Sequence, residues 1–150
     1  MYKQILIPLD GSELAEGAIS HAAELAKAVK AKVTLLSVIE PVAVYSQPGV
    51  VGPVVSVSMD VQDEVGKVAE YLDGVADKLR QEGIDVLRVV REGDPAGQIV
   101  DYAHRNQVDL IVMSTHGRSG IQRLVYGSVA EHVLHHATVP ILLVRVITKD

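Results

Sequence analysis

The chain has 150 residues, which is most simply one domain with an ordinary core, and it contains no Cys, Phe or Trp. The absence of cysteine excludes a disulfide framework and thiolate chemistry. The net charge of −5 argues against a nucleic-acid partner, because a phosphate backbone demands a basic face. No apolar run approaches the length of a signal peptide or a membrane span, so we expect a cytoplasmic protein without a membrane partner.

The first forty residues alternate between strand and helix patterns. A first strand runs from Gln4 to Leu9, with Pro8 marking its end, and Lys32 to Ile39 forms a second. Between them Ser12 is the predicted N-cap of a helix. Its apolar stripe has helical spacing: Leu14, Ala18, Ala22, Leu25 and Val29. This alternation predicts right-handed βαβ units and a parallel sheet.

The segment from Pro41 to Met59 interrupts this rhythm with three prolines, several valines and no charged residue. A loop of this length inside a compact domain is either functional or mobile. Two interpretations stay open: a flap over its own domain and a surface for a partner. The flap is favoured, because scattered surface valines need no special cause.

Strand and helix patterns return in the second half. A helical period runs from Val61 to Glu82 and ends at Gly83, and Val86–Val90 is a less apolar strand that suits a sheet edge. Asp94 is the predicted N-cap of the next helix, with Pro95 at its first position. The core-facing residues of that helix are Ile99, Val100 and Ala103. Strands at 109–114 and 139–147 and a helix from Ser128 bring the totals to five strands and four helices.

The stretch from Asp109 to Arg145 has the order strand, glycine loop, helix. Its first apolar run, 110–113, is typical of a strand covered on both faces. Glycines at 117, 120 and 127 follow, and then Ser128 is the predicted N-cap, with Glu131 completing a capping box. Glycines let backbone approach a phosphate, and a helix N-terminus favours negative charge, so this order predicts an anion site.

The same stretch resembles a known family. The pattern resembles the nucleotide loop of the universal stress protein family, whose ATP-binding members carry Gly-x2-Gly-x9-Gly-(Ser or Thr). In this chain the matching residues are Ser114-Thr-His-Gly117, nine further residues, and then Gly127-Ser128. The resemblance extends through the VAEHVL and VPILLV segments and to ILIPLDGS at the amino end, and so covers the whole chain. It departs from the family at Ser114, where the first glycine is expected. Because a strand ends there, we expect a negative φ at Ser114 that remains compatible with ATP.

The resemblance implies a single doubly wound, Rossmann-like α/β domain with a five-stranded parallel sheet in the order 3-2-1-4-5 and four helices. Strands one and four then lie side by side where the order reverses, which is where such sheets bind ligands. Carried over by position, Asp10 and Val38 resemble residues that contact ribose and adenine, and Gly117, Gly127, Ser128 and Val129 resemble residues around the phosphates. The full set of candidate cofactor-binding residues is Pro8, Leu9, Asp10, Val38, Met113, Ser114, His116, Gly117, Arg118, Gly127, Ser128 and Val129.

Each candidate also has a simpler interpretation. Asp10 is suited to an Asp-Gly turn, and Ser128 to capping a helix without any ligand. Gly117 and Gly127 are explained if their φ is positive. Val38 taken alone is a core residue, and Arg118 is a solvated loop arginine.

Other chemistries have weaker signals. The chain lacks the Gly-x4-Gly-Lys-(Ser/Thr) loop and the Gly-x-Ser-x-Gly elbow. His132 and His136 share a helix face at i, i+4 and could chelate a metal, but there is no Glu in the HExxH position and no evident third ligand. A solvated face is therefore favoured, and we expect no metal site and no catalytic residue.

The sequence thus predicts an ATP-binding protein, with Mg²⁺ on the triphosphate, that is not an enzyme beyond weak ATP hydrolysis. We expect a homodimer through the last strand, Val139 to Ile147, because an exposed apolar edge invites pairing around a two-fold axis. The alternatives are a non-nucleotide dimeric scaffold of the same fold and a very slow ATP hydrolase.

Overall fold

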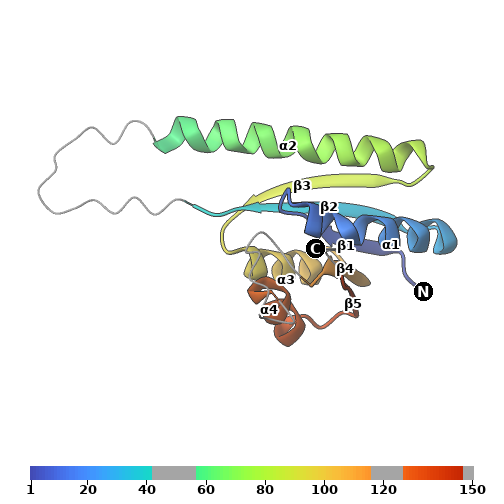
Figure 1. Ribbon diagram of the computed structural model, residues 1–150. Helices are drawn as coiled ribbons and strands as arrows, with labels where there is room; N and C mark the ends of the chain where they lie inside the picture. Colours follow the sequence, from blue (N-terminus) through green and yellow to red (C-terminus); the bar gives the residue numbers. More distant parts are fainter. Residues whose placement is uncertain (42–56, 116–126, 147–150) are drawn as a thin grey trace, which may run out of the picture.

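The computed structural model describes residues 1–41, 57–115 and 127–146 (Figure 1). Strands and helices alternate along the chain. Their bounds are β1 (Gln4–Pro8), α1 (Glu13–Val29), β2 (Lys32–Ile39), α2 (Val57–Gln81), β3 (Val86–Glu92), α3 (Pro95–Arg105), β4 (Leu110–Ser114), α4 (Ser128–His136) and β5 (Ile141–Val144).

The five strands form one parallel sheet in the order β3-β2-β1-β4-β5, as the resemblance implied. β1 lies at the centre, where Ile5 pairs with Val33 of β2 on one side and with Leu110 of β4 on the other. Ile5, Leu6 and Ile7 are all at most 1% exposed, which is the burial expected for a strand covered on both faces.

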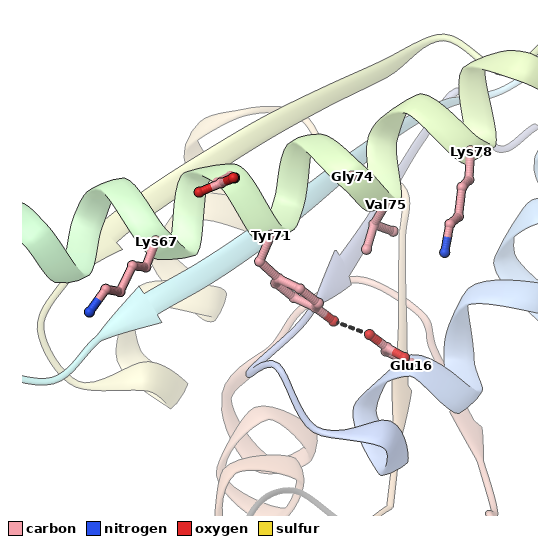
Figure 2. A pocket seen from close by; sticks show the side chains of 7 residues that line it. Glu16, Lys67, Tyr71, Gly74, Val75 and Lys78 are labelled. Atoms are coloured by element: carbon pink, nitrogen blue, oxygen red, sulfur yellow. Dashed lines mark hydrogen bonds between the residues drawn. The ribbon is translucent and has the colours of Figure 1, made fainter.

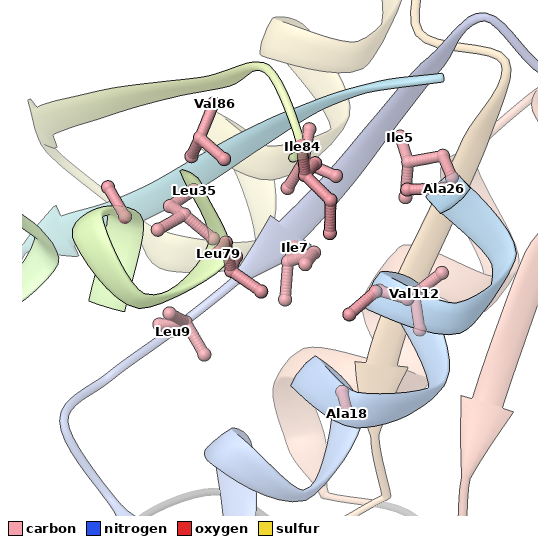
Figure 3. Close-up of a cluster of buried hydrophobic side chains, with 14 of the residues drawn as sticks. Ile5, Ile7, Leu9, Ala18, Ala26, Leu35, Leu79, Ile84, Val86 and Val112 are labelled. Atoms are coloured by element: carbon pink, nitrogen blue, oxygen red, sulfur yellow. The ribbon is translucent and has the colours of Figure 1, made fainter. Parts of the chain in front are cut away.

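Helices cover the two faces of the sheet in separate pairs (Figure 1). Ile5 and Ile7 point into a core shared with α1 and α2, part of which is shown in Figure 3. Leu6, between them, points into the opposite core, where it joins Ile99 of α3 and Val133 of α4. The two-residue period of a strand therefore divides β1 between two hydrophobic layers, which confirms the doubly wound α/β fold.

α1 packs mainly through alanines, and the predicted stripe is confirmed at Ala18, Ala22 and Leu25, which lie in or against the core. Its buried residues are Ala15, Ala18, Ala22, Ala23 and Ala26. Val29 is 39% exposed, so its predicted place in the core was wrong. Small side chains let the helix backbone lie close to the sheet, and a bulkier residue at the end of the stripe falls outside the contact. The predicted N-cap is confirmed, since the Ser12 side chain accepts from the Ala15 N–H at 3.1 Å.

α2 begins at Val57, so the prediction of a loop through Met59 was wrong for residues 57–59. The rest of that loop, including the choice between flap and partner surface, lies outside the described residues. The helix ends as predicted, with Gly83 at φ +85° and its N–H donating to the carbonyl of Arg80. Within the described residues, no helix, α2 included, is both long and apolar enough to cross a membrane.

The two edge strands differ from their predicted lengths. β3 is an edge strand, as expected, and continues to Glu92. It leads to α3, where the Asp94 side chain accepts from the Gly97 N–H at 2.8 Å and confirms the predicted cap. β5 covers Ile141–Val144 only, so the predicted span of 139–147 was too long. Pro140 lacks an N–H for the ladder, and β4 ends at Ser114, opposite Val144.

Candidate functional site

The carboxyl ends of β1 and β4 lie side by side at the point where the strand order reverses. β1 is followed by α1, which packs on one face of the sheet, whereas β4 is followed by α4, which packs on the other face. Open α/β sheets bind ligands at this position, because the diverging connections leave a crevice between the strand ends. The first segment at this crevice is 8–10 and the second is 113–115.

The first segment is anchored at Leu9. Its side chain is 3% exposed and belongs to the core beneath α1. Its N–H donates to the Leu36 carbonyl at 2.8 Å, and its carbonyl accepts from the Ser37 hydroxyl at 2.6 Å. Leu9 therefore fixes the backbone of the segment, and Asp10 is the first residue beyond it with a partly exposed polar side chain.

Asp10 shapes the turn into α1. Its Oδ1 accepts from the backbone N–H of Ser12 at 2.9 Å and from the Ser12 hydroxyl at 2.5 Å. Gly11 has a φ of +83°, which only glycine adopts without strain. The simpler interpretation of Asp10 as a turn residue is thus correct. A carboxylate has about four acceptor positions, so the turn also holds a hydrogen-bond acceptor rigidly at the crevice.

The second segment begins with two buried residues at the end of β4. Met113 is 6% exposed and packs in the core on the α3 and α4 side. Ser114 is 8% exposed and pairs with Val144 as part of the strand. Among the described non-glycine residues only Lys30 and Gln107 have a positive φ. The expected negative φ at Ser114 is confirmed, so serine replaces the family glycine there without backbone strain.

Thr115 joins β4 to both neighbouring elements. Its N–H donates to the Val144 carbonyl at 3.0 Å, and its carbonyl accepts from the Gly127 N–H at 2.7 Å. The residue is 4% exposed, yet its hydroxyl is the one buried side-chain polar atom of the described residues that has no hydrogen-bond partner. Burying an unpaired hydroxyl costs about 1–3 kcal/mol of folding free energy, so a hydrogen bond from a ligand or water would be favourable here. Thr115 is not among the residues predicted to form the site, although it lies inside the glycine motif.

α4 begins one residue earlier than predicted. Its N-cap is Gly127, with φ −62° and ψ 154°, and Ser128 is the first helical residue. The predicted Ser128–Glu131 capping box was therefore wrong, because the bond from Gly127 to Thr115 makes Gly127 the last extended residue. The Gly127 carbonyl accepts from the Glu131 N–H at 2.9 Å, but glycine has no side chain with which to cap the helix. The first-turn N–H groups therefore have no side-chain acceptor from their N-cap residue.

Of the remaining candidate residues, some lie in the described part of the chain and others do not. Gly127 has a negative φ, so positive φ does not explain the glycine. Val38 and Val129 are partly buried against the core on the α3 and α4 side. Pro8 is the last residue of β1 and is half-buried. His116, Gly117 and Arg118 lie outside the described residues.

A second hollow, which the sequence did not predict, lies between α1 and α2 (Figure 2). It has a volume of about 510 Å³ and is lined by Glu16, Lys67, Glu70, Tyr71, Gly74, Val75 and Lys78. Tyr71 points from α2 toward α1 and donates to Glu16 Oε1 at 2.5 Å. Burial, then this hydrogen bond and the charges of Glu16 and Asp10, raise the pKa of Tyr71. The bond ties α2 to the turn of α1 that follows Asp10.

Comparison with known proteins agrees with the fold and the motif. The sequence pattern of the universal stress protein family matches residues 1–145. Universal stress protein MJ0531 of Methanocaldococcus jannaschii is 35% identical, over 100% of this chain and 86% of that protein. The solved structure of MJ0577, from the same organism, has a TM-score of 0.85 at 29% identity and covers 99% of both chains.

Two further solved structures contain an adenine nucleotide. One is a universal stress protein in complex with cAMP, with a TM-score of 0.71 at 21% identity, covering 96% of this chain and 97% of that one. The other is the universal stress protein from Archaeoglobus fulgidus in complex with dAMP, with a TM-score of 0.67 at 22% identity, covering 95% and 97%. At these identities the likeness shows a shared fold.

Proposed function

The chain belongs to the universal stress protein family, and we propose that it is a homodimeric regulatory module that binds ATP in the crevice between β1 and β4. One observation carries the proposal. Across the strand reversal, the fixed carboxylate of Asp10 lies on the β1 side, and the unpaired hydroxyl of Thr115 lies on the β4 side, hydrogen-bonded through its backbone to the N-cap of α4. The carboxylate can accept hydrogen bonds from sugar hydroxyls, and the hydroxyl can donate one to a phosphate oxygen.

The phosphates belong at the amino end of α4. The helix dipole and the uncapped N–H groups of the first turn favour an anion there. Gly127 has a backbone that any residue could adopt, so we attribute the glycine to the close approach that its missing side chain allows. The Thr115 hydroxyl can donate to a phosphate oxygen. Charge-assisted hydrogen bonds contribute about 1.5–3 kcal/mol each, and a few of them, less the cost of binding, support micromolar affinity.

The nucleoside belongs on the β1 and β2 side. A carboxylate accepts hydrogen bonds from ribose hydroxyls, and Asp10 is held in place for this by Ser12. Val38, near the end of β2, is partly buried and offers an apolar surface to a purine. The two relatives of this fold that were solved with cAMP and dAMP support an adenine base as the common element.

Mg²⁺ accompanies ATP in this proposal through the phosphate oxygens. Mg²⁺ usually keeps several waters and is shared between substrate phosphates and at most one or two carboxylates. Over the described ranges there is no group of three or more His, Cys, Asp or Glu residues placed to hold a metal.

The homodimer forms through β5 in this proposal, because the two sheet edges differ in charge. β3 carries Arg88 and Arg91, which bond to Asp73 and Asp101, and charged side chains on an edge discourage pairing. β5 reads Ile-Leu-Leu-Val, with Leu142 39% exposed. Two such edges can pair antiparallel about a two-fold axis.

Two alternative functions can be distinguished from ATP binding by measurement. A non-nucleotide scaffold would dimerise in the same way but show no affinity for ATP. A slow ATP hydrolase would release phosphate faster than the uncatalysed background. We favour binding over hydrolysis, because neither segment at the crevice supplies a histidine, lysine or second carboxylate among its described residues to activate water.

Calorimetric titration of two aspartate variants with ATP and Mg²⁺ tests the proposal. Asp10→Ala should weaken binding by at least about tenfold, or 1.4 kcal/mol, since the sugar loses its acceptor. Asp94→Ala is the matched control, because it removes a carboxylate that also caps a helix but follows β3 at the far edge of the sheet. The proposal is wrong if both variants bind ATP as the wild type does.

A further inference from the structure

The exposed face of α4 carries a pair of stacked imidazoles. His132 and His136 are one helical turn apart, and their ring centroids are separated by 4.1 Å with an angle of 21° between the planes. Both residues are exposed. They are the central and the last residue of the helix, whereas the proposed phosphate site lies at its amino end.

One hydrogen bond fixes the proton on His136. Its Nδ1 is 2.9 Å from the carbonyl oxygen of His132. A carbonyl oxygen only accepts, so Nδ1 carries the proton, and in the neutral ring Nε2 holds the lone pair. Metal-ligating histidines in proteins usually donate their second ring nitrogen to a carbonyl or carboxylate in this way, which orients the ring.

We propose that His132 and His136 form a binding site for one divalent transition-metal ion of the kind that prefers imidazole, represented here by Zn²⁺. Two histidines at i, i+4 are the pair that HExxH helices use for zinc. Zn–N bonds of about 2.0–2.1 Å in tetrahedral geometry place the two nitrogens about 3.3–3.4 Å apart. The rings are stacked with their centroids 4.1 Å apart and 21° between their planes, so both must turn out of the stack before their lone pairs point at one ion. Both side chains are exposed, which leaves room for this rotation.

The site is independent of the Mg²⁺ proposed to accompany ATP. Mg²⁺ is a hard ion that takes oxygen ligands, whereas neutral imidazole selects zinc, copper and nickel. Of the other nearby imidazoles, His104 bonds through Nε2 to the Thr138 hydroxyl at 3.0 Å, and His135 does not share the stack. Among the described residues no third ligand joins this pair, so in this proposal water occupies the remaining coordination positions.

The ion links the last turn of α4 to the turn before it. A nine-residue helix is marginal on its own, and its stability depends on packing. An ion that binds the folded helix more tightly than the unfolded chain raises the stability of the protein by mass action. Zn²⁺ should therefore raise the melting temperature.

The test is calorimetric titration of tag-free, nucleotide-free protein with zinc chloride, beside thermal melting with and without Zn²⁺. The wild type should bind one Zn²⁺ per chain. His132→Ala and His136→Ala should each weaken binding by about tenfold or more and remove the shift in melting temperature. His135→Ala is the matched control on the same exposed turn and should bind as the wild type does.

Two results would overturn the proposal. The first is an absence of both heat and melting shift when the wild type meets Zn²⁺ at about 1 mM, a concentration that corresponds to only −4.1 kcal/mol of binding. The second is an equal loss of affinity in all three variants, which would indicate diffuse binding by exposed histidines. Because all three residues are exposed, the variants should fold, and circular dichroism of each checks this.

Discussion

Gly17 of α1 and Val146, two residues beyond β5, are in such close contact that a Cβ added to Gly17 would overlap Cγ2 of Val146. Val146 therefore lies against the helix that starts at the proposed ribose site. The contact connects β5, the sheet edge that we assign to dimerisation, with α1, the helix that follows Asp10. It also explains a glycine inside a helix, where glycine is otherwise unfavourable by about 0.8–1.0 kcal/mol relative to alanine.

The contact predicts that Gly17→Ala changes the free energy of unfolding in opposite directions in the wild type and in a Val146→Ala variant. Gly17→Ala alone should destabilise the protein, because overpacking costs about 1–3 kcal/mol and outweighs the gain in helix propensity. In a Val146→Ala background the overlap is removed, and the same substitution should be neutral or stabilising by up to about 1 kcal/mol. Urea unfolding measures both. Gly74→Ala is the control, since a Cβ at Gly74 in α2 meets nothing within 4 Å and should stabilise. Equal effects in both backgrounds would refute the packing argument.

The bond from Tyr71 to Glu16 predicts a pH dependence at high pH. Burial, then the bond to Glu16, raise the pKa of Tyr71 in the folded state above its unfolded value of about 10. The stability that the neutral hydroxyl contributes is therefore complete below about pH 10 and is lost as the pH rises beyond it. The unfolding free energy should fall more steeply above pH 10 in the wild type than in Tyr71→Phe. Superimposable pH profiles for the two proteins would count against the interaction.

Thr115 gives a prediction in which stability and affinity move in opposite directions. Thr115→Val keeps the shape but removes the unpaired hydroxyl. The nucleotide-free variant should be more stable than the wild type by about 1 kcal/mol, because a buried polar group without a partner is lost. Its affinity for ATP should fall by about tenfold, since one hydrogen bond to phosphate is lost. Melting without nucleotide and calorimetry with ATP test the two halves, and unchanged affinity would remove Thr115 from the site.

The two edge strands allow a matched test of the dimer. Leu142 on β5 is 39% exposed and Leu87 on β3 is 57% exposed. Leu142→Lys should convert a dimer to a monomer, because a two-fold axis brings the two introduced charges together. Leu87→Lys should leave the dimer unchanged, although that side chain is more exposed. Sedimentation at micromolar concentration distinguishes them, and a monomeric wild type would exclude the proposed interface.

The parts of the fold that local chemistry decides were predictable from the sequence. Ser12 and Asp94 cap their helices as expected, since an N-cap needs only a short polar side chain and the following turn. Gly83 ends α2 in the left-handed region, which glycine alone adopts freely. The strand order came with the resemblance to the family, because periodicity does not determine which strands are neighbours.

The errors arose where distant residues decide the outcome. The cap of α4 moved from Ser128 to Gly127, because Gly127 is held extended by its bond to Thr115, twelve residues earlier in the sequence. β5 is short because β4 ends opposite Val144. The Thr115 hydroxyl lacks a hydrogen-bond partner because of how the fold buries it, and no sequence spacing predicts such an atom.

Calorimetric titration of nucleotide-stripped wild-type protein with ATP and Mg²⁺ tests the central claim most directly. We predict one ATP per chain with micromolar affinity, near −8 kcal/mol. Ser114→Gly should change this affinity by less than about tenfold, because Ser114 is extended and unstrained, whereas Gly127→Val should abolish binding by filling the space of the phosphates. Heat that appears only in Ser114→Gly, with none in a folded wild type, would show that this chain lacks a working nucleotide site.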